Sequence, residues 1–306
     1  MKFRAAHTTA PWKAVVDRYT RSDTRRAIWQ IANTFIPYTA VWVLMVLSLQ
    51  VSYWLTLPLA VVAAAFLVRI FIIHHDCGHG SFLASKRAND CIGFISGLLT
   101  LTPYFYWRHT HAIHHATAGN LDRRGVGDIW TMTVREYQAA SRWERIKFRV
   151  YRNPLVLFVI GPFFLFVFSN RFANFKAGMR WHLSVLWTNL ALVALVALGV
   201  LLVGWKTLLL VQLPVLVFSC IGGVWLFYVQ HQFEGVYWSR QQDWDYVQVA
   251  LAGSSHYALP PLLQWFSGNI GFHHIHHLNP RIPNYFLDRA HRDSPAFQKV
   301  RALRFW

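Results

Sequence analysis

Four long apolar runs constrain the fold more than any other feature of this chain. They cover about residues 34–51, 55–73, 184–204 and 207–229. Each run is close to the length of about 20 apolar residues that a helix needs to cross a bilayer. A short uncharged turn separates the first two runs and "WK" separates the last two, so we expect two tight helical hairpins. The sequence therefore predicts an all-α integral membrane protein, and a charged fraction of 14% agrees with that class.

Two shorter apolar runs, residues 91–106 and 154–168, are each about 15 residues long. The second run is interrupted by Gly161 and Pro162. Apolar runs of this length tend to be interfacial, re-entrant or buried in protein. We therefore predict that neither run crosses the membrane.

The formal net charge of +17 has two possible meanings. On a soluble protein it would suggest nucleic-acid binding, whereas cytoplasmic loops of membrane proteins are also enriched in Lys and Arg. With four spans, Arg69 lies inside a span, where we expect it to snorkel to the interface, and Lys206 lies on the far side. The other 28 of the 30 basic residues lie on the near side with both termini. This bias favours membrane topology over nucleic acid and predicts cytoplasmic termini.

The first residues, "MKFRAAHTTAPWKAVVDRYTRSDTRR", are polar and basic and contain no apolar segment typical of a signal peptide. We therefore expect an integral protein of a bacterial inner membrane. The three cysteines, Cys77, Cys91 and Cys220, form neither a disulfide framework nor a CxxC metal motif.

The 16 histidines gather where the apolar runs end on the near side. In "HDCGH", His75 and His79 are four residues apart and share one face of a helix. "HAIHH" and "HHIHH" repeat an i, i+3, i+4 pattern, which also projects from one helical face. These two segments contribute the residues His111, His114, His115, His273, His276 and His277. Together they predict eight convergent imidazoles, and His231, just past the fourth run, is a ninth candidate.

Ionisable residues at membrane depth are functional by default, and this number of imidazoles suits two metal ions rather than one. The remaining histidines have simpler interpretations. His74, His109 and His274 lie off the shared faces or are extra to the pattern, so we expect them to support or space the ligands. His7, His182, His256 and His291 are scattered, and we assign them surface or packing roles.

Imidazole suits iron, zinc, copper and nickel, and a catalytic zinc needs only three protein ligands. A pair of redox-active irons fits the set better, because the cluster has many imidazoles and almost no carboxylate or thiolate ligands. Two irons can cleave dioxygen, and the resulting oxidant could remove hydrogen from an unactivated methylene. Ligating histidines usually donate their other N–H to a carboxylate or carbonyl. Asp76, Asp128 and Glu234 are candidates for that role, with a helix cap or salt bridge as the alternative. Asn269 could hold a metal-bound water or be a turn residue in "SGNIG".

The ordered segments HDCGH, HAIHH and HHIHH resemble the three histidine boxes of the membrane-bound fatty acid desaturases. The flanking segments "HAIHHATAGNLDRRGVGDIWTMTVREY" and "LQWFSGNIGFHHIHHLNPRIPNY" are similar to the acyl-lipid, omega-6 (delta-12) branch. The resemblance runs from about residue 30 to 295. We therefore treat residues 1–306 as a single desaturase domain.

The resemblance implies a non-haem di-iron centre that uses dioxygen and two electrons to insert a cis double bond. It implies four membrane helices under a cytosolic helical cap, with interfacial helices beside them. The implied ligands are His75, His79, His111, His114, His115, His231, His273, His276 and His277. The implied substrate is a fatty acyl lipid or acyl thioester. The chain contains no cytochrome b5 segment, so we expect a separate ferredoxin-like or cytochrome b5-like electron carrier.

Other functions share parts of this pattern. The same scaffold could act as a hydroxylase, an acetylenase, a decarboxylase or a carotenoid oxygenase, because one oxidant serves them all. "HDCGH" also resembles the HExxH motif of an intramembrane zinc protease, although that site needs one further ligand rather than seven. A metal transporter would place polar ligands at the middle of the spans, and here the span centres are nearly free of ionisable groups.

Overall fold

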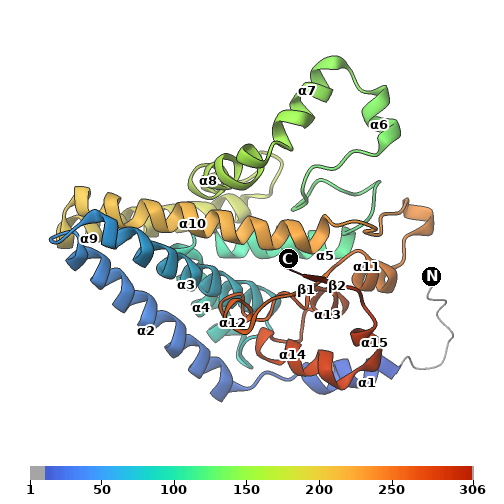
Figure 1. The fold of residues 1–306 in the computed structure, drawn as a ribbon, viewed down its shortest axis with the longest axis horizontal. Helices are drawn as coiled ribbons and strands as arrows, with labels where there is room; N and C mark the ends of the chain where they lie inside the picture. The colour runs from blue at the N-terminus through green and yellow to red at the C-terminus, as the bar shows by residue number, and fades with distance from the viewer. Residues whose placement is uncertain (1–10, 305–306) are drawn as a thin grey trace.

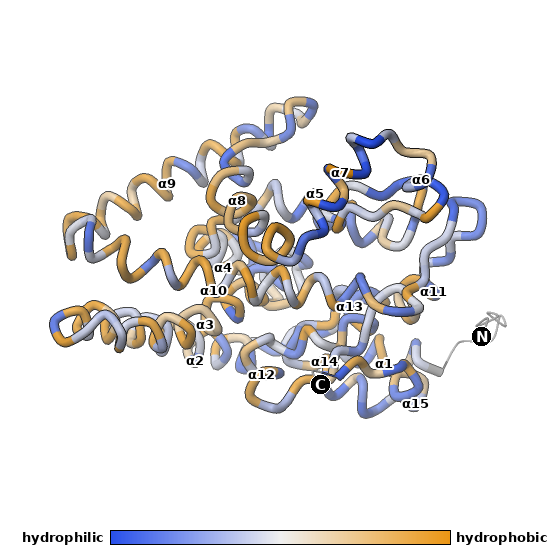
Figure 2. The backbone as a smooth tube through the Cα atoms, turned by 45° about the horizontal axis from the view of Figure 1, so that its top comes forward, coloured by the Kyte–Doolittle hydropathy of each residue, from blue (hydrophilic) through white to orange (hydrophobic). Residues whose placement is uncertain are grey.

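Four long helices form the body of the computed structural model, which describes residues 11–304 (Figure 1). These helices are α2 (Thr24–Ser48), α3 (Tyr53–His79), α9 (Met179–Val203) and α10 (Trp205–His231). Each is long and apolar enough to cross a membrane. Figure 2 shows hydrophobic residues along α9 and α10, and hydrophilic ones around α6 and α11 at the other end of the molecule. The predicted helical membrane fold with four apolar helices is thus confirmed.

The four helices extend beyond their apolar runs. α2 begins ten residues before the predicted start, because the side chain of Asp23 accepts a hydrogen bond from the backbone N–H of Arg26 and caps the helix. α3 continues through the first histidine box to His79 and ends at Gly80, whose positive φ of 65° suits glycine. α10 ends on His231. His75, His79 and His231 are therefore held on rigid continuations of the membrane helices.

α3 lies between α2 and α10 and packs closely against both. Small side chains at this interface, including Ala60 and Ala63, are fully buried beside Val211 and Val215 of α10. Small residues allow helices in a membrane to approach closely, where packing replaces the hydrophobic effect as the driving force. The indole N–H of Trp42 in α2 donates to Gln212 of α10 over 3.1 Å and closes the three-helix contact.

The shorter apolar runs form shorter helices. Residues 91–106 fall in α4 (Lys86–Leu99) and the start of α5 (Tyr104–Thr117). α4 has 14 residues, too few to cross the hydrocarbon layer, as predicted. Residues 154–168 form a π-helical turn, η1 (Val156–Ile160), and α8 (Gly161–Val167). α7 (Arg142–Tyr151) and the segment Val156–Arg171 meet at a 64° bend and would make a fifth span if counted as one, so the non-spanning assignment of 154–168 stays a prediction.

The remaining elements form the cap and an outlying arm. The arm carries α6 (Val134–Ala139) and α7, which lie apart from the bundle at the top of Figure 1. The other helical elements are α1 (Pro11–Tyr19), η2 (Ser169–Arg171), η3 (Gln241–Asp243), α11 (Tyr246–Ala252), α12 (Pro261–Phe266), α13 (His273–Leu278), α14 (Asn284–Asp293) and α15 (Pro295–Gln298). A short parallel pair, β1 (His256–Ala258) and β2 (Ala302–Arg304), is the one addition to the predicted helical fold among the described residues.

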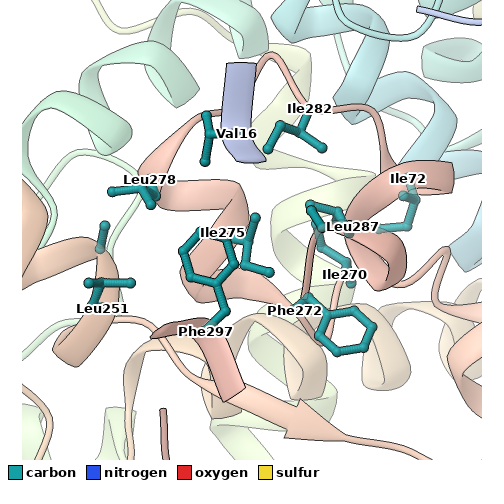
Figure 3. Close-up of a cluster of buried hydrophobic side chains, with 12 residues drawn as sticks. Val16, Ile72, Leu251, Ile270, Phe272, Ile275, Leu278, Ile282, Leu287 and Phe297 are labelled. Carbon is teal, nitrogen blue, oxygen red and sulfur yellow. The ribbon is translucent and has the colours of Figure 1, made fainter. Parts of the chain in front are cut away.

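A buried apolar cluster supports α13, which carries the third histidine box. Ile275 of α13 is fully buried, and Figure 3 shows it among side chains that include Leu278, Leu287 and Phe297. The cluster joins segments from α1, α3, α11, α14 and α15 around one face of α13. Because Ile275 faces this core, its neighbours His276 and His277 are directed to the other side of a short helix.

Arg69 does not snorkel to the interface. Its side chain is 6% exposed and lies under α12, where its Nε atom donates to Thr34 over 3.1 Å and an Nη atom donates to the Trp265 carbonyl. The guanidinium lies 4.0 Å from the centroid of the Trp265 ring. The protein supplies these partners inside the helix bundle, so Arg69 joins α2, α3 and α12 instead of reaching water.

The positions of the four helices lead to a prediction about topology. A reporter inserted at residue 120 and one fused to the C-terminus should lie on the same side, because each pair of spans forms a hairpin that returns the chain to the side it started from. That side should be the cytoplasm, because it carries 28 of the 30 basic residues. A reporter inserted at residue 205 should lie on the opposite side. A cytoplasmic signal at 205, or opposite signals at 120 and the C-terminus, would contradict the four-span arrangement.

Candidate metal centre

Nine histidines from four separate segments meet at the ends of α3 and α10. They are the nine predicted residues, His75, His79, His111, His114, His115, His231, His273, His276 and His277, and seven of them are buried. α5 is held beside α3 because the buried hydroxyl of Tyr104 donates to the Cys77 carbonyl over 2.8 Å. Tyr104 packs so closely on Gly93 of α4 that a Cβ there would lie 2.2 Å from its ring. These contacts bring the second box onto the first.

Hydrogen bonds to backbone carbonyls hold the third box beside α10. The backbone N–H of Ser255 donates to the Gln230 carbonyl over 3.0 Å, and the Gln230 side chain donates to the Ile270 carbonyl over 3.2 Å. The hydroxyl of Tyr246 in α11 donates to the His277 carbonyl over 2.6 Å. The last turn of α10, which carries His231, is thereby fixed against the start of α13.

The first group of metal-ligating side chains contains five histidines. One nitrogen from each lies within 4.8 Å of the others, and the members are His75, His79, His111, His115 and His276. The Nε2 atom of His115 lies 3.1 Å from that of His111 and 3.0 Å from that of His276. All three histidine boxes contribute to this group.

The second group contains His114, His231 and His277, also within 4.8 Å of one another. The Nε2 atoms of His114 and His231 are 3.2 Å apart. His273 adjoins this group, because its Nε2 atom lies 2.9 Å from that of His231. The ring of His115 stacks on that of His277 with centroids 4.2 Å apart, so the two groups are direct neighbours.

The donor sets fit metal ions. A metal–imidazole bond of about 2.1 Å places neighbouring ligand nitrogens about 3 Å apart, as the Nε2 contacts here are. In addition, the Nε2 atoms of His79 and His277 are buried without a hydrogen-bond partner. An unpartnered buried polar atom is costly, and a metal ion in each group would remove that cost. The residues therefore suit two metal ions with imidazole ligands.

Carboxylates orient two of the imidazoles. The Nδ1 atom of His75 donates to Asp76 over 3.0 Å, and that of His114 donates to Asp128 over 2.9 Å. Each bond fixes the ring so that its Nε2 atom faces the cluster, as expected for metal-ligating histidines. The structure thus places Asp76 and Asp128 where the sequence analysis expected them.

Glu234 and Asn269 lie elsewhere. Glu234 is exposed beyond the end of α10, next to a turn at Gly235, and the described residues give it no contact with His231. Asn269 has a left-handed backbone with φ 59° and donates its side-chain N–H to the Asn284 carbonyl over 3.1 Å. Its side-chain oxygen accepts from Gln264, so the structure places it as a turn residue rather than beside the cluster.

The other histidines lie outside the two groups. His74 has its Nδ1 atom 3.0 Å from the Gly93 carbonyl, and His109 stacks on Trp181 with centroids 4.3 Å apart. His256, His274 and His291 form a separate set of ring contacts behind α13. His182 is partly buried near the start of α9, and His7 lies outside the described residues.

Burial sets the charge of the cluster. Desolvation lowers the pKa of His111, His115, His276 and His277 well below the ordinary imidazole value, and the neighbouring imidazoles lower it further. These rings are therefore neutral at physiological pH. A neutral imidazole has a free lone pair, which is the form that binds a metal ion.

Three contributors were not predicted from the sequence. Asn284 is 1% exposed and donates to the second oxygen of Asp76 from its backbone N–H over 2.6 Å and from its side chain over 2.9 Å. Gln30 of α2 donates to the Asn284 side-chain oxygen over 3.0 Å. Trp107 stacks on His111 with ring centroids 4.3 Å apart. Asn284 and Gln30 carry no local signal, because their partners lie far away in the sequence. Trp107 lies one helical turn before His111 in α5, so their i, i+4 spacing could have indicated the contact.

His231 provides the first test of the site. Replacing it with alanine removes the imidazole between His114 and His273, so we expect the purified variant to bind fewer than two metal ions per chain and to lose activity. His256→Ala, outside both groups, is the matched control and should keep its metal. Mass spectrometry of the purified proteins measures the metal content. If the His231→Ala protein still bound two metal ions per chain, His231 would not be a ligand and the site would consist of the other eight histidines.

Asn284 provides the second test. In Asn284→Leu, Asp76 loses the side-chain donor and His75 is held less firmly, so metal affinity should fall about 10–100-fold. Competition with a chelator measures this in protein that remains monodisperse on size exclusion. Gln30→Leu removes the hydrogen bond from Gln30 to Asn284, one step further from the metal ligands, and should cause a smaller loss of metal affinity. Unchanged metal retention in Asn284→Leu would show that the Asp76 contact does not support the site.

The comparisons with known proteins agree with this geometry. The sequence model of the family described as "Fatty acid desaturase" matches residues 52–306. A "Fatty acid desaturase" of Bacillus subtilis is 50% identical over 295 residues, which are 96% of this chain and 84% of that protein. An "sn-1 acyl-lipid omega-3 desaturase (ferredoxin)" of Synechocystis sp. is 33% identical over 72% of this chain and 62% of its own length. An "sn-1 oleoyl-lipid 12-desaturase" of the same organism is 26% identical over 78% of this chain and 68% of its own length.

The family match covers three of the four apolar helices, α3, α9 and α10, and every box histidine. It accounts for a cluster of nine imidazoles, which neither a zinc protease nor a transporter requires. With four apolar helices and a histidine cluster able to bind metal, the chain belongs to the fatty acid desaturase family and is a membrane enzyme of that family.

Proposed function

We propose that the protein inserts a cis double bond into a fatty acyl chain in an oxygen-dependent reaction at two non-haem irons. The observation that carries the proposal is the meeting of two neighbouring groups of histidines at the ends of α3 and α10. Zinc would need fewer protein ligands and could not supply redox chemistry. Imidazole ligation suits iron, and the family match supports the same metal chemistry.

The ligand assignment follows the two groups. The five histidines of the first group would hold one iron, and His114, His231 and His277 with the adjoining His273 would hold the other. Asp76 and Asp128 keep the Nδ1 protons of His75 and His114 in place, so that the Nε2 atoms stay available. Asn284 in turn fixes Asp76. We assign all of residues 1–306 to one desaturase domain.

When bound, the irons would use dioxygen, two electrons and two protons to remove two hydrogens from neighbouring methylenes and release two waters. The chain's own residues position the ligands and exclude bulk water. The neutral imidazoles of His111, His115 and His276 add no charge to the site. Seven of the nine rings are buried. A small hollow beside the second group is lined by Asp128 and Gln232 as well as by Ile129, Phe227 and Trp238.

The substrate and the electron donor come from outside the chain. We infer an acyl lipid substrate, because several similar proteins are named as acyl-lipid desaturases and the histidines lie at the ends of membrane helices. An acyl thioester is the alternative carrier. Electrons would come from a separate ferredoxin-like or cytochrome b5-like protein, and acidic carriers of that kind suit a chain with a net charge of +17. We place the protein in a bacterial inner membrane, with the histidines and both termini on the cytoplasmic side.

Product analysis tests the proposal. Expressed with a reductase and carrier under air, in a host that lacks polyunsaturated lipids, the protein should yield a new cis-unsaturated fatty acid, detected by gas chromatography with mass spectrometry. A His276→Ala variant, inactive because it lacks a ligand of the first group, is the control. The position of the double bond decides whether the omega-6 (delta-12) resemblance extends to activity. Hydroxylated, acetylenic or shortened products alone would contradict desaturation and leave the metal site standing.

A further inference from the structure

α7 presents two chemically distinct faces. On one face, the rings of Phe148 and Tyr151 pack against Trp130 with centroids 5.2 and 5.7 Å away. On the opposite face, three large apolar side chains are in the open, with exposed fractions of 63% for Trp143, 47% for Ile146 and 54% for Val150. Their spacing of three and four residues puts them on a single stripe along the helix. The arm's own packing leaves this stripe uncovered.

Basic side chains border the exposed stripe. Arg142 and Arg149 lie along one edge and Lys147 along the other, and all three are exposed. The Lys147 ammonium lies 5.6 Å from the Trp143 ring centroid, so its aliphatic part lies along the apolar surface. The one acidic residue of α7, Glu144, lies away from the stripe and belongs to a capping box with Ser141. An apolar stripe between two rows of cations is the pattern of a helix that lies in a lipid interface.

The end of α7 is fixed at the level of the metal centre. Arg152, directly after the helix, donates to the Gln232 side-chain oxygen over 3.0 Å and to the Tyr228 hydroxyl over 3.4 Å. Phe158 in η1 packs on Trp225 and Tyr228 of α10 with centroids 5.3 and 5.1 Å away. The C-terminal end of α7 therefore lies where α10 ends, at the boundary of a membrane helix.

The exposed apolar surface continues from α7 into the next segment. Leu155, Ile160, Phe164 and Phe168 are each at least half exposed, and they follow the 64° bend between α7 and the segment Val156–Arg171. A helix that turns sharply away from a neighbour packed along α10 can lie along the membrane surface instead of entering it. The stripe on α7 is thus followed directly in the chain by further exposed apolar side chains between residues 155 and 168, which also suit lipid.

We propose that α7 lies on the cytoplasmic membrane surface, with Trp143, Ile146 and Val150 among the acyl chains and its basic residues on anionic phosphate headgroups. The apolar stripe favours lipid over a soluble acidic protein, because such a protein would match the charges and leave the stripe in water. Continuity with α8 favours lipid over a second copy of the chain. The arm would thus hold the loop that carries Asp128, the partner of His114, against the bilayer.

Spin labelling of the full-length protein tests this placement without any need for activity. Single cysteines replace Ile146 on the stripe and Glu144 on the other side of α7, in a Cys91→Ser background because Cys91 is exposed, whereas Cys77 and Cys220 are buried. In Glu144→Cys the Ser141 hydroxyl still accepts the backbone N–H of residue 144. The labelled proteins are reconstituted in bilayer discs of phosphatidylglycerol and phosphatidylcholine, and relaxation by oxygen and by a water-soluble nickel complex is measured.

At position 146, oxygen accessibility should exceed nickel accessibility several-fold, and position 144 should show the reverse. Replacing Arg142 and Lys147 with glutamine should shift the label at 146 toward water in the anionic discs. Equal nickel accessibility at 146 and 144 would overturn the proposal, because the stripe would then be in water. Protection of position 146 from both reagents would also overturn it, because a protein would then cover the stripe.

Discussion

The convergence of nine imidazole rings is the constraint on which the rest of this structure depends. Burial removes water from rings such as His111, His115 and His276, and desolvation lowers their pKa and keeps them neutral. Neutral rings can approach to Nε2 separations of 2.9–3.1 Å, where charged rings would repel one another. The cluster therefore needs a rigid frame that holds its members together against the cost of their burial.

The frame is supplied by helices that belong to the membrane part of the protein. α3 and α10 run without a break from the apolar layer into the cluster, so the two helices that pack tightly together also carry His75, His79 and His231. The boxes on α5 and α13 are not continuous with any span. Tyr104 ties α5 to α3, whereas the apolar core around Ile275 sets the orientation of α13. The metal centre therefore depends both on the packing of the membrane helices and on the packing of the cap.

Polar contacts between distant segments hold the details of the site. Asn284, at the start of α14, joins Gln30 of α2 to Asp76 of α3, and Asp76 orients His75. A buried polar network of this kind stabilises one arrangement strongly when every member has a partner, and it loses much more than one bond when a member is removed. Arg69 shows the same principle deeper in the bundle, where Thr34 and the Trp265 carbonyl replace water.

The sequence alone determined the features that depend on local periodicity. Four apolar runs of membrane length predicted four long helices, and the i, i+3, i+4 spacing of the boxes predicted which imidazoles share a helical face. The order of the three boxes was sufficient to indicate the family. Asp76 and Asp128 could be proposed because each lies close in sequence to a ligand.

Tertiary structure decided whatever depends on contacts between distant residues. The division of the ligands into a group of five and a group of three with His273 beside it follows from the crossing of α3, α5, α10 and α13, which no local pattern encodes. Glu234 is three residues from His231 yet exposed, because α10 ends between them, whereas Asn284 is 208 residues from Asp76 and bonds to it twice. Sequence spacing determines the direction in which side chains project from one helix, and only the packing between helices determines which side chains from different helices meet.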